Sequence, residues 1–154
     1  MEDIIFCNKE EIKIKSDAQP RVCARTILPI MTQNEIKEIE KKPFLNKRDV
    51  YYTVNYKGEE YVIYIPKGYT WDAMTIPRFA WSLVGLSKEN VCGLIASCVH
   101  DKICENKYLV NYNRKLSTII FKELCIASSM PEWKANFISF FVDNFQKCVK
   151  GWKK

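Results

Sequence analysis

Histidine occurs once in the 154 residues of this chain, at position 100. A single histidine excludes metal sites built from several imidazoles, and the seven cysteines contain no CxxC pair that could replace them. The longest uncharged apolar run, Val91–Val99, has nine residues. Because a membrane-spanning helix needs about 20 apolar residues, none is expected here.

The chain opens with Met1-Glu2-Asp3, which is acidic where a secretory signal would be basic, and no apolar segment follows. We therefore expect a cytoplasmic protein with no membrane partner. In that reducing compartment the seven cysteines would be small buried hydrophobic residues, and no disulfide would form. A zinc site that uses His100 and Cys104, four residues apart on one helix face, would need two more ligands from elsewhere in the chain.

No repeat, low-complexity segment or linker divides the chain, and its length suits one core, so residues 1–154 are expected to form a single domain. Hydrophobic residues make up 47% and charged residues 27%, as in ordinary globular proteins. The formal net charge is +6, from 24 Lys and Arg against 18 Asp and Glu. This excess favours an anionic partner only if the basic side chains cluster on one face of the folded protein.

A β-hairpin is the clearest structural signal. Val50–Tyr56 and Glu60–Ile65 are rich in β-branched and aromatic residues, and a short connection that contains Gly58 separates them. The tyrosines alternate along these runs as sheet residues do, which favours packing over a nucleic-acid stacking surface.

Two weaker strand signals precede the hairpin, at Ile4–Cys7 and at Arg25–Ile30. Thr32 and Glu35 have the spacing of a capping box, and they predict a short charged helix that Pro43 ends. The N-terminal half therefore consists mainly of predicted strands.

The C-terminal half is expected to be helical. The predicted helices begin at Pro77, before Val91–Val99, at Asn111 or Asn113, and after Met130-Pro131-Glu132. The second is apolar on every face, which is typical of a buried helix. The fourth would turn an aromatic stripe to the core, backed by Ile138 and Val142, namely Trp133, Phe137, Phe141 and Phe145. The sequence predicts an α+β fold with an N-terminal antiparallel β-sheet and hairpin, followed by a C-terminal cluster of about four helices.

Two polar segments interrupt these packing patterns. Gly68–Arg78 brings Asp72, Thr75 and Arg78 together at a strand-to-helix junction, where free backbone N–H groups would support an anion site. The simpler interpretation is that Asp72 or Thr75 caps the helix and that Arg78 is a surface charge.

The second polar segment is Val99-His100-Asp101, in which the only histidine stands at the end of the predicted buried helix. A histidine in this position can titrate near neutral pH or can serve as a structural hydrogen-bonding group. We expect Asp72 and His100 to approach within direct or one-water contact.

These segments resemble a phage protein family that is known as domain of unknown function 1353. The resemblance rests on GYTWDAMTIPR at 68–78, VHDK at 99–102, and Asn113-Arg114 followed by Phe121. The chain departs from the family pattern in having Trp71 before the motif aspartate, no aromatic residue directly after His100-Asp101, and Thr118 in place of an aspartate.

The resemblance implies a virus-associated protein, similar to an anti-CRISPR protein that acts against an RNA-targeting type VI system. Our leading hypothesis is a counter-defence protein in the host cytoplasm that cleaves RNA or associates with it. His100 would be the general base or acid, and Asp72 or Asp101 would orient it.

In this scheme Arg78, together with Arg114, would stabilise charge on the phosphate, and Thr75 would hold a phosphate oxygen or cap the helix. Metal-free transesterification needs no cofactor, although Asp72 and Asp101 could instead bind one divalent ion. The alternative hypothesis is a non-catalytic inhibitor that binds a host defence protein, with the polar cluster serving structure alone. A cell-wall hydrolase is disfavoured because the chain lacks an export signal and a second histidine.

Overall fold

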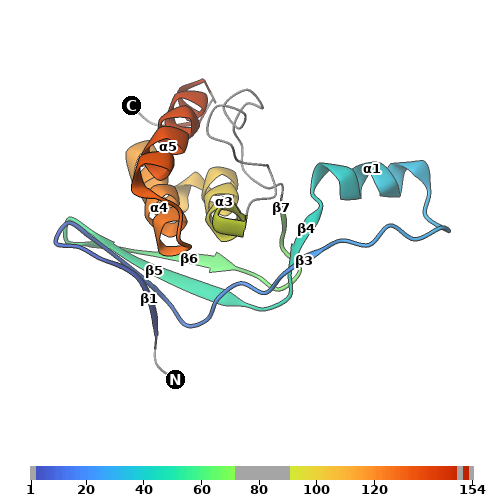
Figure 1. Cartoon of the computed structure of the whole chain (residues 1–154), viewed down its shortest axis with the longest axis horizontal. Helices are drawn as coiled ribbons and strands as arrows, with labels where there is room; N and C mark the ends of the chain where they lie inside the picture. The colour runs from blue at the N-terminus through green and yellow to red at the C-terminus, as the bar shows by residue number, and fades with distance from the viewer. Residues whose placement is uncertain (1–2, 72–90, 149–150, 153–154) are drawn as a thin grey trace.

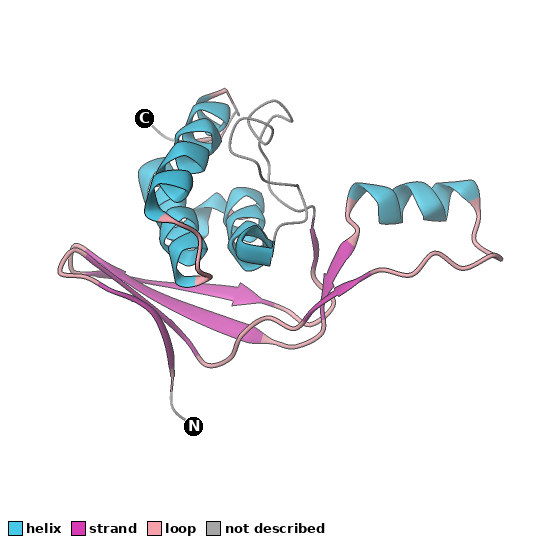
Figure 2. Ribbon diagram, in the orientation of Figure 1, coloured by secondary structure: helices cyan, strands magenta, loops and turns pink. Residues whose placement is uncertain are grey.

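The computed structural model describes residues 3–71, 91–148 and 151–152 of the chain. Within these ranges, a four-stranded sheet carries helices on one face, and a smaller sheet leads to a projecting arm that holds helix α1 (Figure 1). Figure 2 shows the same division, with strands mainly from the N-terminal half and helices from the C-terminal half. The predicted α+β architecture is confirmed, while the helix predicted to begin at Pro77 lies outside the described residues.

The larger sheet is antiparallel throughout and has the strand order β1-β2-β5-β6. Its inner residues alternate with exposed ones along each strand, as expected for a sheet with one solvated face. The strands are β1 (Ile4–Asn8), β2 (Ile12–Ser16), β5 (Val50–Tyr56) and β6 (Glu59–Ile65). The predicted hairpin is therefore β5–β6, and β2 is an additional strand in the Ile-Lys-Ile-Lys-Ser segment.

The smaller sheet has the order β3-β4-β7 and lies at the base of the arm. Its strands are β3 (Val22–Ala24), β4 (Phe44–Asn46) and β7 (Thr70–Trp71), and between β3 and β4 the chain forms α1 (Gln33–Lys41). Thr32 caps α1, since its hydroxyl accepts a hydrogen bond from the Glu35 backbone N–H at 3.2 Å, so the predicted cap is confirmed.

The strand predicted at Arg25–Ile30 is wrong. Pairing in β3 ends at Ala24, apart from one further hydrogen bond from the Arg25 N–H to the Pro43 carbonyl. The chain then turns at Leu28, whose carbonyl accepts from the Met31 N–H at 3.1 Å. The apolar residues of this run lie in the projecting arm, and Ile30 is 90% exposed.

Helices α3 (Val91–Glu105) and α4 (Arg114–Ala127) contact the larger sheet, and α5 (Glu132–Lys147) packs against α4. A 3-10 helix, η1 (Lys107–Val110), joins α3 to α4. Five consecutive residues of α3, from Ala96 to His100, are buried, which confirms that this helix lies inside the protein. The helix continues to Glu105, so His100 lies within α3 rather than at its end as predicted. The helix continues because Asp101 and Lys102 lie on a partly exposed side where their charges remain hydrated.

The core face predicted for α5 is right at Ile138 and Val142, which are buried, but wrong for the outer aromatic residues. Trp133 is 62% exposed and Phe145 is 48% exposed, whereas Phe137 packs against the edge of the core. The buried face of α5 is instead lined by mostly smaller side chains, namely Ala135, Ile138, Ser139, Val142 and Gln146. These side chains let α5 pack closely against its neighbours, while the bulky rings remain outside.

Asn113 is the N-cap of α4, and its side-chain Oδ1 accepts a hydrogen bond from the Leu116 backbone N–H at 3.0 Å. Replacing Asn113 with Ala removes this acceptor, and we expect the free energy of unfolding to fall by about 1 kcal/mol. Urea denaturation of the purified variants measures this loss. Asn113→Ser, which keeps a capping oxygen, should retain most of the stability, and equal losses in both variants would contradict the capping role.

Candidate functional site

His100 lies in the core at the junction of α3, α4 and α5, with only 2% of its surface exposed. Its ring makes an edge contact with Phe121 of α4, at 5.4 Å between centroids. One ring nitrogen, Nδ1, lies 3.7 Å from the Cys104 sulfur, one turn further along α3. The other, Nε2, accepts a short hydrogen bond from the side-chain amide of Gln146 on α5.

A buried chain of hydrogen bonds continues from Gln146. Its Oε1 accepts from the Ser117 hydroxyl at 2.8 Å, and the same hydroxyl lies 2.6 Å from the Arg114 carbonyl. Since Nε2 of His100 is the acceptor of the Gln146 amide, the ring proton belongs on Nδ1, and the imidazole is neutral. His100 thus joins α3 to α5, and Ser117 connects both to α4.

Burial sets the protonation of this histidine. Removal from water lowers the pKa of His100 from 6.5 to about 4, because the charged imidazolium loses its hydration. At neutral pH nearly every molecule therefore carries the neutral ring. Such a group is a weak proton acceptor and has no proton to donate from Nε2.

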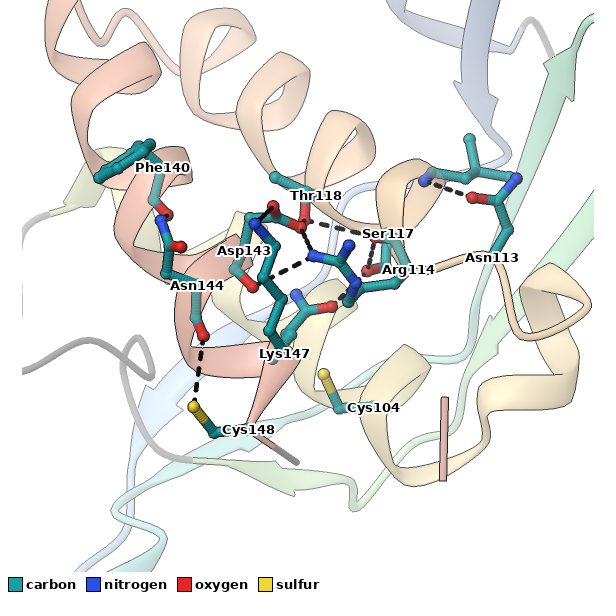
Figure 3. A network of polar contacts seen from close by, with 12 residues as sticks. Cys104, Asn113, Arg114, Ser117, Thr118, Phe140, Asp143, Asn144, Lys147 and Cys148 are labelled. Carbon is teal, nitrogen blue, oxygen red and sulfur yellow. Dashed lines mark hydrogen bonds and ion pairs between the residues drawn. The ribbon is translucent and has the colours of Figure 1, made fainter. Parts of the chain in front are cut away.

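Arg114 occupies the first turn of α4, and its guanidinium is engaged by a carboxylate of α5. Nη1 forms a short ion pair with Asp143 and also reaches the Asp143 carbonyl at 3.3 Å. Figure 3 shows Arg114, Thr118 and Asp143 pointing toward one another across the α4–α5 contact. The Thr118 hydroxyl donates to Asp143 Oδ1 at 3.2 Å, and Lys147 lies 3.8 Å from Oδ2 of the same carboxylate.

The carboxylate beside Arg114 comes from Asp143 of α5, and Thr118 directs its hydroxyl to the same carboxylate. The ion pair is partly buried, with side-chain exposures of 21% for Arg114 and 25% for Asp143. Arg114 therefore has a structural role in the described protein, since it ties the start of α4 to α5.

A pocket of about 380 Å³ opens beside His100, and we call it the histidine pocket. Acidic and basic side chains mix at its rim, where Lys42 and Glu105 approach to 3.4 Å. Asp101, one of the predicted site residues, also lines this pocket. Burial, together with the nearby Asp101 carboxylate, raises the pKa of the Cys104 thiol to about 12. The full lining is Lys41, Lys42, His100, Asp101, Cys104, Glu105, Lys107, Phe145, Gln146 and Trp152.

A second pocket, of about 400 Å³, lies at the base of the arm. Three of its lining side chains are cationic and none is acidic, so we call it the basic pocket. It is lined by Arg21, Leu45, Asn46, Lys47, Lys67 and Gly68. Sequence reasoning did not identify this cluster, because its basic residues come from three separate loops.

The buried side chain of Asn46 holds those loops together. Its Oδ1 accepts from the backbone N–H groups of Arg21 at 3.1 Å and of Arg48 at 3.3 Å, and its Nδ2 donates to the Pro66 carbonyl at 3.1 Å. The Asn46 carbonyl in turn accepts from the Gly68 N–H at 2.7 Å, where a φ of +93° favours glycine. One amide therefore fixes the backbone that carries the basic side chains.

Three of the predicted site residues, Asp72, Thr75 and Arg78, lie outside the described residues, so the expected approach of Asp72 to His100 stays a prediction. Among the residues that the structure does describe, His100 and Asp101 line one pocket, whereas the guanidinium of Arg114 is paired with Asp143.

Metal and disulfide chemistry find no support in the described ranges. No group of three or more potential metal-binding His, Cys, Asp or Glu side chains occurs there, so the zinc site suggested by His100 and Cys104 gains no further ligands. The six cysteines whose side chains are described are free thiols, and of these Cys148 is exposed. No helix within the same ranges is long and apolar enough to cross a membrane.

The fold places the chain among α+β proteins in which helices cover one face of an antiparallel sheet. Residues 49–142 match the family described as protein of unknown function DUF1353, and because the match spans more than half of the 154 residues, the protein belongs to this family. The matched segment includes His100, Asp101 and Arg114. No curated protein and no solved structure matches the chain.

The neutral state of His100 predicts a pH dependence of stability. In the unfolded chain the imidazole takes up a proton as the pH falls below about 6.5, whereas the folded protein resists protonation down to about pH 4. The free energy of unfolding should therefore fall as the pH is lowered, by about 2 kcal/mol between pH 7 and pH 5 from this group alone.

Urea denaturation at both pH values measures the effect, with His100→Asn as the comparison because asparagine does not titrate. The variant should lose about 2 kcal/mol less than the unmodified protein over this interval. Parallel losses in the two proteins would show that His100 is not held neutral.

Proposed function

We propose that this protein associates with RNA, and that it does so through the basic pocket rather than through proton transfer by His100. The resemblance to an anti-CRISPR protein suggests the setting, which is counter-defence in the cytoplasm of an infected cell. The observation that carries the proposal is the convergence of Arg21, Lys47 and Lys67 on a pocket that has no acidic lining residue.

Three clustered cations favour a polyanion, and the one carboxylate beside them, Asp49, accepts from the Lys67 backbone N–H at 2.8 Å and offsets part of the charge of Lys67 alone. Each phosphate that a Lys or Arg neutralises releases counterions, which drives binding to nucleic acid. Arg21 adds a planar guanidinium that can hold two phosphate oxygens at once. Because Asn46 fixes the backbone of the loops before any ligand arrives, little ordering entropy is lost when phosphates bind.

The environment of His100 supports association rather than cleavage. A general base that works near neutral pH has a pKa close to that pH, whereas burial lowers the pKa of His100 to about 4. Its Nε2 is also occupied by Gln146. These contacts support a structural role for His100 in the packing of three helices.

RNA binding is tested with the double variant Arg21→Glu/Lys47→Glu. Asn46 contacts the backbone of Arg21 and not its guanidinium, so the exchange should leave the fold intact. We expect the affinity for a single-stranded RNA of about ten nucleotides to fall at least tenfold, with the slope of log K against log salt smaller by about 1.4, or 0.7 for each phosphate contact. Fluorescence anisotropy across a salt series measures both quantities.

The matched control is Lys13→Glu/Lys15→Glu, which makes the same change of charge on the exposed side of β2. It should weaken binding much less, because long-range attraction alone is largely screened at physiological salt. Equal losses in the two double variants would contradict a specific basic pocket, and an absence of RNA binding by the unmodified protein would contradict the proposed function.

Cleavage is tested separately. A labelled RNA incubated at neutral pH with the protein should remain at full length, both with magnesium and with EDTA, because neither His100 nitrogen is free and basic enough to act. Gel electrophoresis measures the intact fraction. Cleavage that disappears in a folded His100→Asn variant would restore the catalytic role.

The second candidate is a non-catalytic inhibitor that binds a host defence protein. The observation in its favour is the outer surface of α5, where Trp133 is 62% exposed and Phe140 is 64% exposed. Exposed aromatic residues are typical of protein interfaces. If this candidate is correct, Trp133→Ser/Phe140→Ser should abolish counter-defence activity while RNA affinity stays unchanged.

A further inference from the structure

The lining of the histidine pocket combines aromatic and polar side chains. Trp152 and Phe145 supply rings, and the buried His100 and Gln146 line the same pocket. Its volume of about 380 Å³ is at the small end of the range for small-molecule sites, which suits one flat heterocycle with its sugar. Aromatic walls of this kind bind planar rings by stacking.

Trp152 is held in place from one side. The Lys107 ammonium lies 5.4 Å from the centre of the Trp152 ring and also donates to the Cys104 carbonyl at 3.0 Å. This cation over the ring fixes the indole relative to α3.

The indole also carries an unused hydrogen-bond donor. Nε1 of Trp152 is buried and has no partner within the described part of the chain. Because a buried N–H without an acceptor is costly, such a group in a pocket wall favours a ligand that brings an acceptor. Nucleobases provide carbonyl oxygens and ring nitrogens at their edges, together with a face for stacking.

We propose that the histidine pocket takes one unpaired base of a single-stranded RNA, stacked on Trp152. This inference rests on the proposed function and specifies that the RNA is single-stranded. A base within a duplex is stacked between its neighbours and cannot enter the pocket. At the rim Lys42 is paired with Glu105 at 3.4 Å, so Lys41 and Lys107 are the lining cations that would meet an adjoining phosphate.

The two pockets are joined by one short segment of chain. Lys42 lines the histidine pocket and Lys47, five residues later, lines the basic pocket. Five extended residues span at most roughly 18 Å. A stacked single strand covers that distance with about five nucleotides at 3.4 Å each, so one short RNA can reach both pockets.

The test is anisotropy with a single-stranded RNA of about ten nucleotides and the variant Trp152→Ala. We expect the affinity to fall about tenfold, which is the usual effect of losing one base–aromatic stack. Trp152→Phe keeps a stacking ring and should stay within about threefold of the unmodified protein. Trp133→Ala removes an exposed tryptophan outside the pocket and should bind normally.

Fluorescence provides an independent readout that does not depend on the alanine variant folding. A stacked base should quench the emission of Trp152, so RNA should quench the unmodified protein more than Trp152→Phe. The same RNA annealed into a duplex should bind without this extra quenching.

The outcomes separate the two proposals. The proposed base-binding pocket is overturned if a folded Trp152→Ala protein keeps its RNA affinity, or if RNA quenches the unmodified protein and Trp152→Phe equally. RNA association itself is still upheld in that case if Arg21→Glu/Lys47→Glu lowers the RNA affinity. If the unmodified protein binds no RNA, both proposals fall. Weakening by Trp152→Ala with rescue by Trp152→Phe supports the base pocket.

Discussion

Helix α3 is buried, and a helix in that position must find partners inside the protein for each polar side chain that it carries. Ser97 meets this requirement locally by donating to the Leu94 carbonyl at 2.9 Å. His100 meets it through Gln146, which in turn contacts Ser117. The same bonds that satisfy the imidazole therefore help to set how α3, α4 and α5 pack, and the burial that results keeps the ring neutral. In the sequence His100 looked like a catalytic residue because it is a lone histidine in an apolar helix. In the fold the same apolar surroundings give it a structural role.

Local signals in the sequence were sufficient for most of the elements. The Thr32 and Asn113 caps and the β5–β6 hairpin depend on residues within a few positions of one another, so they could be predicted. The full set of side chains that α5 turns to the core could not be predicted in this way. Its aromatic residues form a regular stripe, but close packing in the interior selected smaller side chains such as Ala135 and Ser139.

The candidate site was harder to predict for the same reason. The sequence singled out His100 and Arg114, but their partners, Gln146 and Asp143, lie 46 and 29 residues further along the chain. An isolated sequence contains no signal for such distant pairs. The basic pocket likewise depends on Asn46, whose bonds join segments up to 25 residues apart.

The family match covers only part of each candidate binding pocket. Residues 49–142 contain the buried histidine and Lys67, whereas Arg21, Lys47 and Trp152 lie outside that range. A shared helical core can in this way carry binding surfaces that differ between members, because function resides in sites placed on a fold.

Helix α1 has a single buried residue, Ile39. Its last residue, Lys41, and the following C-cap residue, Lys42, line the histidine pocket. So little buried apolar surface gives α1 a small share of the folding free energy, and its local opening should cost less than opening of the core. A ligand that contacts those lysines would bind only the closed form of the arm. By thermodynamic linkage, occupation of the pocket would then slow hydrogen exchange in α1 as a whole, including turns that the ligand never touches.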